Sequence, residues 1–482
     1  MEKLRSLLIE YKDICLKYKK EFLGLLVIYL LAFSAIIRAN YTYADDIGRT
    51  FEGYHGWLDW SRYGTELLAT LMHANWELTD ISPFPQILAC IIMAACGVVL
   101  LNVFKEEQKI TVWNILAVSI TAVGPYFLGL ISYKFDSPYM AVAFLASVLP
   151  FLFRKFPVKV YVIVSVLCLL VMCTTYQAYS GVYPMVVCLL VMQGLRKGEK
   201  FKDGLKFLGI SAGCYVASLC VFWLFLMREN GVSVFSLSNI VTDTMNRYVG
   251  YYQTVYSDFA VTWLLLTAAL LICFLVVFTG TDKIKKSIAL LLGVLTILIN
   301  SVLCFGAYLF ISREAFDTRA MCGWNVYLGL FAVFISFQAK TCIPKFVYSV
   351  LAWCFFGFAL THGNALAQEQ TYIDYRVQLI VNDLNDLDVM QNDKAKKLHV
   401  EGYIGNAPVN ENMAKTYPIL KRTIYSPFNE GALGEYYLCN YINLPNVEAG
   451  SDEEMSSSLP VVKDTAFYTI KADEENIIIT MK

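Results

Sequence analysis

Two adjacent carboxylates, Asp45 and Asp46, lie early in the segment 39–85, just after the first apolar run of the chain. Neighbouring carboxylates near a low-dielectric boundary repel one another, so that one of them holds a proton more readily. Such a group suits general base or acid chemistry near neutral pH. Asp46 could equally begin a helix over the residues IGRTFEGY that follow. Both interpretations stay open, and so does the choice between the two aspartates.

Arginines near these carboxylates and in one later loop have side chains that suit the binding of a phosphate group. Arg49 and Arg62 follow in the same segment, and Arg313 and Arg319 lie in ISREAFDTRAM between two apolar runs. Close to a membrane plane, the planar fork of guanidinium donors can bind a lipid phosphate. A single arginine would more simply extend its head group to water or to lipid head groups. Four arginines in two loops weigh against that simpler explanation.

Short segments between later apolar runs place further polar side chains at loop tips. Lys134 and Asp136 lie in YKFDSP, although Asp-Ser-Pro also forms turns and helix starts well. Tyr176 and Gln177 lie in TTYQAYSG, and these side chain types suit hydroxyl-rich ligands. The ordinary aromatic belt of membrane proteins would explain this stretch equally well.

The composition predicts that a lipid bilayer surrounds most of the chain. Of the 482 residues, 57% are hydrophobic and 16% are charged, against about 25% charged in ordinary soluble domains. Mean hydropathy is +0.52. A helix needs about 20 apolar residues to cross the hydrocarbon core. We expect about eleven transmembrane helices, near residues 22–38, 86–104, 110–131, 138–153, 158–175, 179–195, 207–227, 259–280, 288–311, 321–338 and 346–362.

Lysine and arginine are concentrated in every second connection between these helices. The clusters are Lys12, Lys17, Lys19, Lys20, Lys105, Lys109, Arg154, Lys155, Lys159, Arg196, Lys197, Lys200, Lys202, Lys206, Lys283, Lys285, Lys286, Lys340 and Lys345. The positive-inside rule then places the N-terminus in the cytoplasm. It places outside the alternate connections 39–85, 132–137, 176–178, 228–258 and 312–320, together with the tail. The first apolar run lacks a clear cleavage site, so we expect a retained helix.

Polar residues throughout the tail predict a small extracytoplasmic α/β domain at 363–482, after a membrane domain at 1–362. Its predicted elements are a helix at 371–390, a strand at 397–404 and a hairpin at 466–481. In the long first loop, residues 58–73 carry apolar side chains on one face. They could lie in the membrane interface as an amphipathic helix.

Several other classes of protein are disfavoured by the sequence. Most of the 14 cysteines lie in apolar runs, no CxxC pair occurs and the chain has 4 histidines, so we expect neither a disulfide framework nor a metal site. No GxxxxGK(S/T) phosphate-binding loop is present. A net charge of −1 without a basic domain gives no reason to expect nucleic acid as a partner.

The loops that carry these polar residues resemble a known family. YADDIGRTFEGYHGWLDWSRYGTELL followed by DISPFPQILA is similar to the signature of the type II glucosyltransferases. These are the Gtr-like enzymes of bacterial envelopes, including enzymes that convert O-antigen serotypes. FDSPYMAVAFLASVLPF at 135–151, the Tyr-Gln region at 175–183 and Arg319 also fit the pattern. The resemblance covers about residues 20–340 and weakens over the tail.

This resemblance implies a GT-C-like enzyme that moves a hexose, usually glucose, from a polyprenyl phosphate to a glycan outside the bacterial cytoplasmic membrane. Such enzymes place a catalytic acidic residue in the first outward loop, which carries over to Asp45 or Asp46. We expect an inverting transfer with this aspartate as the base. The expected donor-phosphate ligands are Arg49, Arg62, Arg319 and Lys134, and the candidate sugar or acceptor contacts are Asp80, Asp136, Gln177 and Tyr176. A lipid-phosphate leaving group needs less neutralisation than a nucleotide diphosphate, so we expect neither a metal nor a cofactor.

Two other classes would share parts of this pattern. A flippase or transporter of a lipid-linked glycan would need no acidic base, but it would need a polar path across helices that are mostly apolar inside. A scaffold or sensor that acts through its tail leaves the aromatic and acidic loop 39–85 unexplained. The expected partners are therefore a polyprenyl-linked sugar, a surface glycan and membrane lipids.

Overall fold

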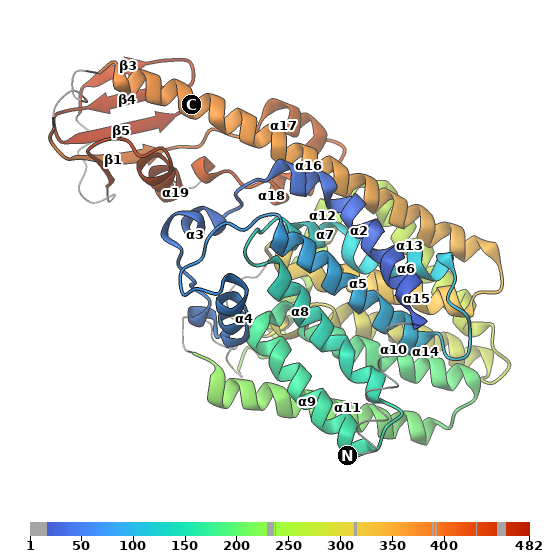
Figure 1. Ribbon diagram of the computed structural model, residues 1–482. Helices are drawn as coiled ribbons and strands as arrows, with labels where there is room; N and C mark the ends of the chain where they lie inside the picture. The colour runs from blue at the N-terminus through green and yellow to red at the C-terminus, as the bar shows by residue number, and fades with distance from the viewer. Residues whose placement is uncertain are drawn as a thin grey trace.

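A bundle of long apolar helices carries a small sheet domain at one end (Figure 1). The computed structural model describes residues 17–228, 236, 238–312, 316–387, 390, 393–429, 431–450 and 459–482. Lys12 and Arg313, which entered the sequence analysis, lie outside these ranges.

Nine helices among the described residues are long and apolar enough to cross a membrane, judged by length and composition. They are Lys19–Ala39 (α2), Phe84–Phe104 (α5), Val158–Thr175 (α9), Gln177–Lys197 (η3 and α10), Phe201–Leu226 (α11 and η4), Val261–Thr279 (α13), Lys286–Leu303 (α14), Thr318–Gln338 (η6 and α15) and Cys342–Asn385 (α16). A further candidate is a pair, Val112–Val123 (α6) and Pro125–Ile131 (α7), bent by 61°. Ser137–Phe153 (α8 and η2) forms a shorter apolar helix. The helices are consistent with a multi-pass membrane protein.

The number of spans stays a prediction, although each of the predicted apolar segments coincides with one of these helices. The described helices allow nine spans, or ten if the bent pair counts as one. The bend has a local cause, because Gly124 has an extended backbone and Pro125 lacks the N–H that would continue α6. Asn325 of α15 packs against the break, since a Cβ on Gly124 would approach its side chain to 2.4 Å.

The centre of the bundle is α15, which is buried along its whole apolar length. It packs against α6, α10 and α13. At the edge, α16 packs along α2, and Gly363 permits their close approach. A Cβ at this position would lie 2.3 Å from the backbone nitrogen of Ile36.

The helix α16 runs without interruption from the bundle into the C-terminal domain (Figure 1). The segments predicted at 346–362 and 371–390 are therefore one helix, because no proline separates them and Gly363 is tolerated where α2 packs. Its C-terminal part buries the predicted apolar face, including Ile373, Val377 and Ile380. The predicted domain boundary at 362 falls inside this helix, and the division into domains stays a prediction.

The described part of the C-terminal domain contains a sheet of five strands in the order β2-β1-β5-β4-β3. The strands are Lys396–Glu401 (β1), Val447–Ala449 (β2), Val461–Asp464 (β3), Tyr468–Ala472 (β4) and Asn476–Met481 (β5). β1 is parallel to β2 and β5, whereas β3, β4 and β5 are antiparallel neighbours. The predicted strand and hairpin are confirmed. Short helices connect β1 to β2, namely Pro408–Ala414 (α17), Leu420–Thr423 (α18), Pro427–Asn429 (η8), Gly431–Tyr436 (α19) and Tyr437–Tyr441 (η9).

The long first loop folds into short helices, Asp46–Glu52 (α3), Leu58–Trp60 (η1) and Tyr63–His73 (α4). Figure 1 shows α3 between the bundle and the C-terminal domain. The predicted amphipathic helix at 58–73 is interrupted at Ser61, whose φ is 57°. Within α4, Ala69 is buried while Leu67 and Leu71 are exposed. An exposed apolar face suits an interfacial helix, and that location stays a prediction.

Candidate functional site

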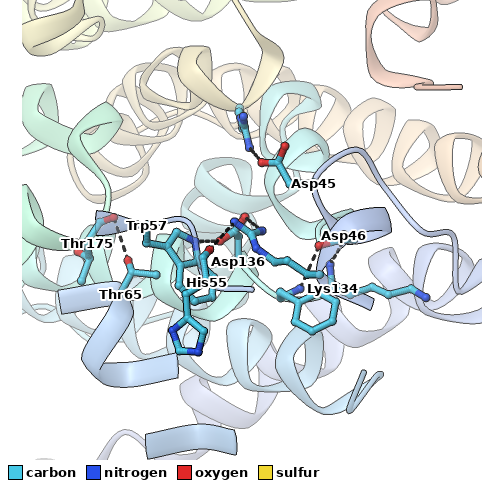
Figure 2. Close-up of polar contacts among 11 residues, drawn as sticks. Asp45, Asp46, His55, Trp57, Thr65, Lys134, Asp136 and Thr175 are labelled. Atoms are coloured by element: carbon cyan, nitrogen blue, oxygen red, sulfur yellow. Dashed lines mark hydrogen bonds and ion pairs between the residues drawn. The ribbon is translucent and has the colours of Figure 1, made fainter. Parts of the chain in front are cut away.

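Asp45 and Asp46 stand where the chain enters α3, after α2 has ended at Ala39. A helix does begin at Asp46, and Asp45 occupies the N-cap position without a side-chain capping bond. The two carboxylates turn toward different partners (Figure 2). The sequence pair is therefore split into two separate environments.

Asp46 is fully buried and holds the loop that precedes α8. Its carboxylate accepts hydrogen bonds from the backbone N–H groups of Lys134 at 2.8 Å and Phe135 at 3.4 Å. Burial raises the pKa of Asp46 from 3.8 to about 8, although Arg49 acts to lower it. Burial thus favours the protonated form of this carboxyl group, whose hydrogen bonds hold residues 134 and 135 in place.

Asp136 is the centre of a buried polar cluster. Its carboxylate accepts hydrogen bonds from Arg49 Nη1 at 2.6 Å and from Trp57 Nε1 at 2.5 Å (Figure 2). The Arg49 guanidinium lies 4.5 Å from the Trp57 ring centroid. Burial acts to raise the pKa of Asp136, but Arg49, with Arg62 and Arg319, outweighs it and holds that pKa below its usual value. Asp136 is therefore an anion whose charge Arg49 neutralises.

Lys134 extends this cluster toward Asp80. Its Nζ lies 3.1 Å from Asp80 Oδ2 and 3.4 Å from Thr42 Oγ1. Asp80 also accepts hydrogen bonds from the backbone and hydroxyl of Ser82. We call the buried residues Asp46, Arg49, Trp57, Lys134 and Asp136, together with the exposed Asp80 at their edge, the buried network.

Asp45 and Arg319 form a second, more open pair, which we call the junction pair. Arg319 Nη1 lies 3.3 Å from Asp45 Oδ2, and 44% of the Asp45 side chain is exposed. The Arg319 guanidinium lies 4.7 Å from the ring centroid of Tyr133. The ring and the carboxylate together fix the direction of the arginine.

Two cavities meet at the junction pair. The first, which we call the apolar cavity, has a volume of about 690 Å³. Its lining residues are Asp45, Arg49, Tyr54, Gly56, Trp57, Asp59, Trp60, Ser61, Arg62, Cys173, Tyr176, Gln177, Ser180, Tyr215, Leu219, Phe222, Trp223, Met227, Arg228, Val302, Leu303, Gly306, Ala307, Tyr308, Leu309, Phe310, Ile311, Asp317, Arg319 and Ala320. The tyrosine cavity, of about 450 Å³, is lined by Tyr43, Ala44, Asp45, Gly48, Glu52, Tyr54, Gly129, Tyr133, Asp317, Thr318, Arg319, Arg422, Tyr425, Leu433 and Tyr436. Both volumes fall within the range of about 300–1,000 Å³ that is usual for small-molecule sites. Asp45, Tyr54, Asp317 and Arg319 line both cavities.

Three predicted site residues, Arg62, Tyr176 and Gln177, line the apolar cavity on the side of η1 and α9. The Arg62 guanidinium lies 4.9 Å from the ring centroid of Tyr176. Gln177 Nε2 donates to the carbonyl of Trp60 at 3.3 Å, which ties the start of η3 to η1. Thr65 Oγ1 donates to the carbonyl of Thr175 at 3.1 Å and fixes α4 on the end of α9 (Figure 2).

The predicted site residues therefore fall into two groups. Those that line a cavity are Asp45, Arg49, Arg62, Tyr176, Gln177 and Arg319. Those that lie in the buried network and, within the described chain, do not line either cavity are Asp46, Asp80, Lys134 and Asp136. Among the described residues no group of three or more His, Cys, Asp and Glu could hold a metal ion, and the expectation of a metal-free reaction stays a prediction.

Several lining residues were missed in the sequence. Asp317 lies in the loop that contains Arg319, so the signal was available there. Tyr43 lies two positions before Asp45, so its place beside the acidic pair was also visible in the sequence. Arg422 and Tyr436 lie in the tail, where no motif indicated that the chain returns to the bundle.

The fold is consistent with a multi-pass helical membrane protein, in which an apolar and a tyrosine-rich cavity meet at a carboxylate–arginine pair. The chain belongs to the GtrII family of glucosyl transferases, because the family model described as "Glucosyl transferase GtrII" matches residues 15–337. Over 422 residues it is also 21% identical to an "Uncharacterized 55.3 kDa protein in gtrB 5'region" of Salmonella phage P22, covering 84% of this chain and 85% of that protein. No solved structure matches the chain. The family resemblance is confirmed, and membership indicates glucosyl transfer in surface glycan modification.

Proposed function

We propose that the chain is a GT-C-like enzyme that transfers glucose from a polyprenyl-phosphate donor to a glycan on the outer side of the bacterial cytoplasmic membrane. The single observation that carries this proposal is the position of Asp45, at the contact between the apolar cavity and the tyrosine cavity. A lipid-linked donor and a water-soluble acceptor need this combination. Lysine- and arginine-rich connections support a cytoplasmic N-terminus and an extracytoplasmic site.

The apolar cavity suits the donor. Phe222, Trp223 and Phe310 contribute apolar surface to it, while Arg62 and Arg319 lie at its polar part. In the proposal the polyprenyl chain lies along the apolar side chains and the phosphate faces the two arginines. Arg49 is already neutralised by Asp136, so we assign it a positioning role through the buried network.

Asp45 is the proposed base, and Asp46 is the proposed positioning residue. An acceptor hydroxyl oxygen attacks the anomeric carbon with its lone pair, and its proton passes to the Asp45 carboxylate. The bond from the anomeric carbon to the phosphate oxygen breaks, and its electron pair stays on the polyprenyl phosphate. The anomeric centre inverts, and Asp45 later releases the proton to water. Arg62 and Arg319 stabilise the charge that develops on the phosphate.

The test is transfer by the purified full-length chain with radiolabelled polyprenyl-phosphoglucose and isolated envelope polysaccharide. Asp45→Asn should lower kcat by about 10²–10⁴-fold with little change in donor KM, since general base catalysis is lost. Asp46→Asn is the matched control and should keep kcat within about fivefold, because an amide retains one acceptor oxygen, as the protonated acid does. Full turnover by the Asp45→Asn variant would show that Asp45 is not the general base. Absence of transfer by the wild-type chain without cell extract would favour the flippase alternative.

A further inference from the structure

The tyrosine cavity adjoins the apolar cavity at the junction pair. This placement matters if the proposed function holds, because an inverting displacement needs the attacking hydroxyl and the leaving phosphate on opposite sides of the anomeric carbon. With the donor phosphate in the apolar cavity, the hydroxyl must approach from the tyrosine cavity. Asp45 lines both cavities, so its carboxylate can reach a hydroxyl there.

Four parts of the fold form the walls of the tyrosine cavity, and one of them is the segment 317–319, which carries Arg319 of the junction pair. The start of the first loop contributes Tyr43 and Glu52, and the loop after α7 contributes Tyr133. The C-terminal domain contributes Tyr425 and Tyr436. Tyrosines offer a flat apolar face and a hydroxyl at the rim, and this combination fits the faces and hydroxyl groups of a pyranose ring.

Direct contacts hold the C-terminal wall against the first loop. Tyr436 donates its hydroxyl to Glu52 Oε1 at 2.8 Å, and its ring meets Phe51 edge-on at 6.1 Å. Tyr43 donates to the carbonyl of Thr423 at 3.0 Å, and its ring lies 6.0 Å from that of Tyr425. The wall is therefore positioned by the same segment that carries Asp45.

A partly buried ion pair anchors this wall to the bundle. Arg422 Nη1 binds Asp258 Oδ2 at the end of α12 (Ile240–Asp258), and Arg422 Nη2 binds the carbonyl of Phe316. Tyr126 of α7 donates to the same Asp258 oxygen at 2.9 Å. The backbone N–H of Ile419 donates to the Asp258 carbonyl at 3.1 Å. The anchor couples the C-terminal domain to the α6–α7 bend beside the site.

The charges of the lining indicate what kind of sugar it accepts. Three carboxylates line the cavity, those of Asp45, Glu52 and Asp317, against the guanidinium groups of Arg319 and Arg422. Arg422 is already paired with Asp258, which lies outside the lining. An acidic sugar would therefore meet an excess of negative charge, and like charges in close contact are strongly disfavoured.

We propose that the tyrosine cavity is the acceptor site, that the C-terminal domain supplies its recognition surface through Tyr425 and Tyr436, and that it selects an uncharged pyranose of the glycan. The hydroxyl of this sugar attacks the donor in the step already described. The C-terminal domain is thus part of the acceptor site.

The first test measures acceptor KM, donor KM and donor hydrolysis without acceptor, using the full-length chain, polyprenyl-phosphoglucose and isolated envelope polysaccharide. Tyr436→Ala should raise acceptor KM by about tenfold, the size expected for one lost ring contact, and leave donor KM and hydrolysis unchanged. Tyr468→Phe is the matched control, because it removes a tyrosine hydrogen bond to Asp383 at 2.7 Å in the same domain but outside the cavity. An unchanged acceptor KM in Tyr436→Ala overturns this inference alone. Absence of both transfer and hydrolysis in the wild type overturns the proposed function with it.

The second test addresses charge selection. Oxidation of the primary hydroxyls of the same polysaccharide to carboxylates gives an acidic counterpart of the acceptor. The wild-type chain should use the oxidised polysaccharide at least tenfold less well, by roughly the effect of one unfavourable charge contact. The double variant Glu52→Gln/Asp317→Asn should recover part of this loss. Equal transfer to both polymers, or a loss without recovery, overturns the selection of an uncharged sugar.

Discussion

The buried network and the junction pair contain the same types of residue, but they differ in what remains open to a ligand. In the network, Asp136 is surrounded by Arg49 and Trp57, and Asp46 accepts from backbone N–H groups. In the junction pair, Asp45 has one arginine partner and keeps 44% of its side chain exposed. Asp46, Asp136 and Asp45 are the same residue type and differ in how far protein groups surround them. The surrounded carboxylates hold the structure of the site, and the exposed one faces its cavities.

Removal of Asp136 should have the largest effect on stability. Asp136→Ala leaves the Arg49 guanidinium buried without its carboxylate, and breaking a buried pair in this way costs about 3–5 kcal/mol. We expect a clearly lowered Tm in thermal unfolding of the purified chain. The double variant Asp136→Ala/Arg49→Leu should recover part of the loss, because no charge then stays unpaired. A wild-type Tm in the single variant would contradict the assigned network.

Removal of Arg319 should affect activity and leave the fold intact. Arg319→Ala should lower kcat for glucose transfer by about 10²–10³-fold, the usual effect of losing one charge-stabilising donor. Arg319→Lys should recover part of this activity. Tm should stay close to that of the wild type, since the pair is partly exposed. A large drop in Tm with normal activity of the folded fraction would place Arg319 in the framework instead.

The buried Asp46 should give the smallest effect, a dependence of stability on pH. Its folded pKa of about 8 lies above the unfolded value of 3.8, so the folded chain binds more protons between these values and loses stability as pH rises through this window. One proton accounts for at most about 1.4 kcal/mol per pH unit. Asp46→Asn should remove this slope, so that its Tm relative to the wild type rises by a few degrees from pH 6 to pH 8. Parallel pH profiles of both chains would contradict the burial argument.

The helices of the bundle were readily predicted, because long apolar runs carry their own signal. The break between α6 and α7 at Gly124 and Pro125 was not predicted, because both residues lie within one apolar stretch. The continuity of α16 was missed for the opposite reason: polar residues after 362 looked like a new domain, yet nothing there prevents the helix from continuing.

The residues of the candidate site could be predicted from the sequence, but their roles could be predicted much less well. Asp45 and Arg319 are 274 positions apart, and the family motifs nevertheless marked both. Lys134 and Asp136 were expected to contact a ligand, but sequence does not reveal that Asp80 and Arg49 neutralise them. Tyr436 carried no signal, because its place beside Glu52 depends on how the whole C-terminal domain docks.

The unbroken helix α16 fixes the distance between the helical bundle and the sheet of the C-terminal domain. At 1.5 Å per residue, a helix of 44 residues spans about 66 Å, roughly twice the thickness of the hydrocarbon core. One part of α16 packs against α2 within the bundle, and the other part supports the sheet. The height and rotation of the proposed acceptor wall are thus set by the number of residues in a single helix, and one residue more or fewer would turn that wall by about 100°.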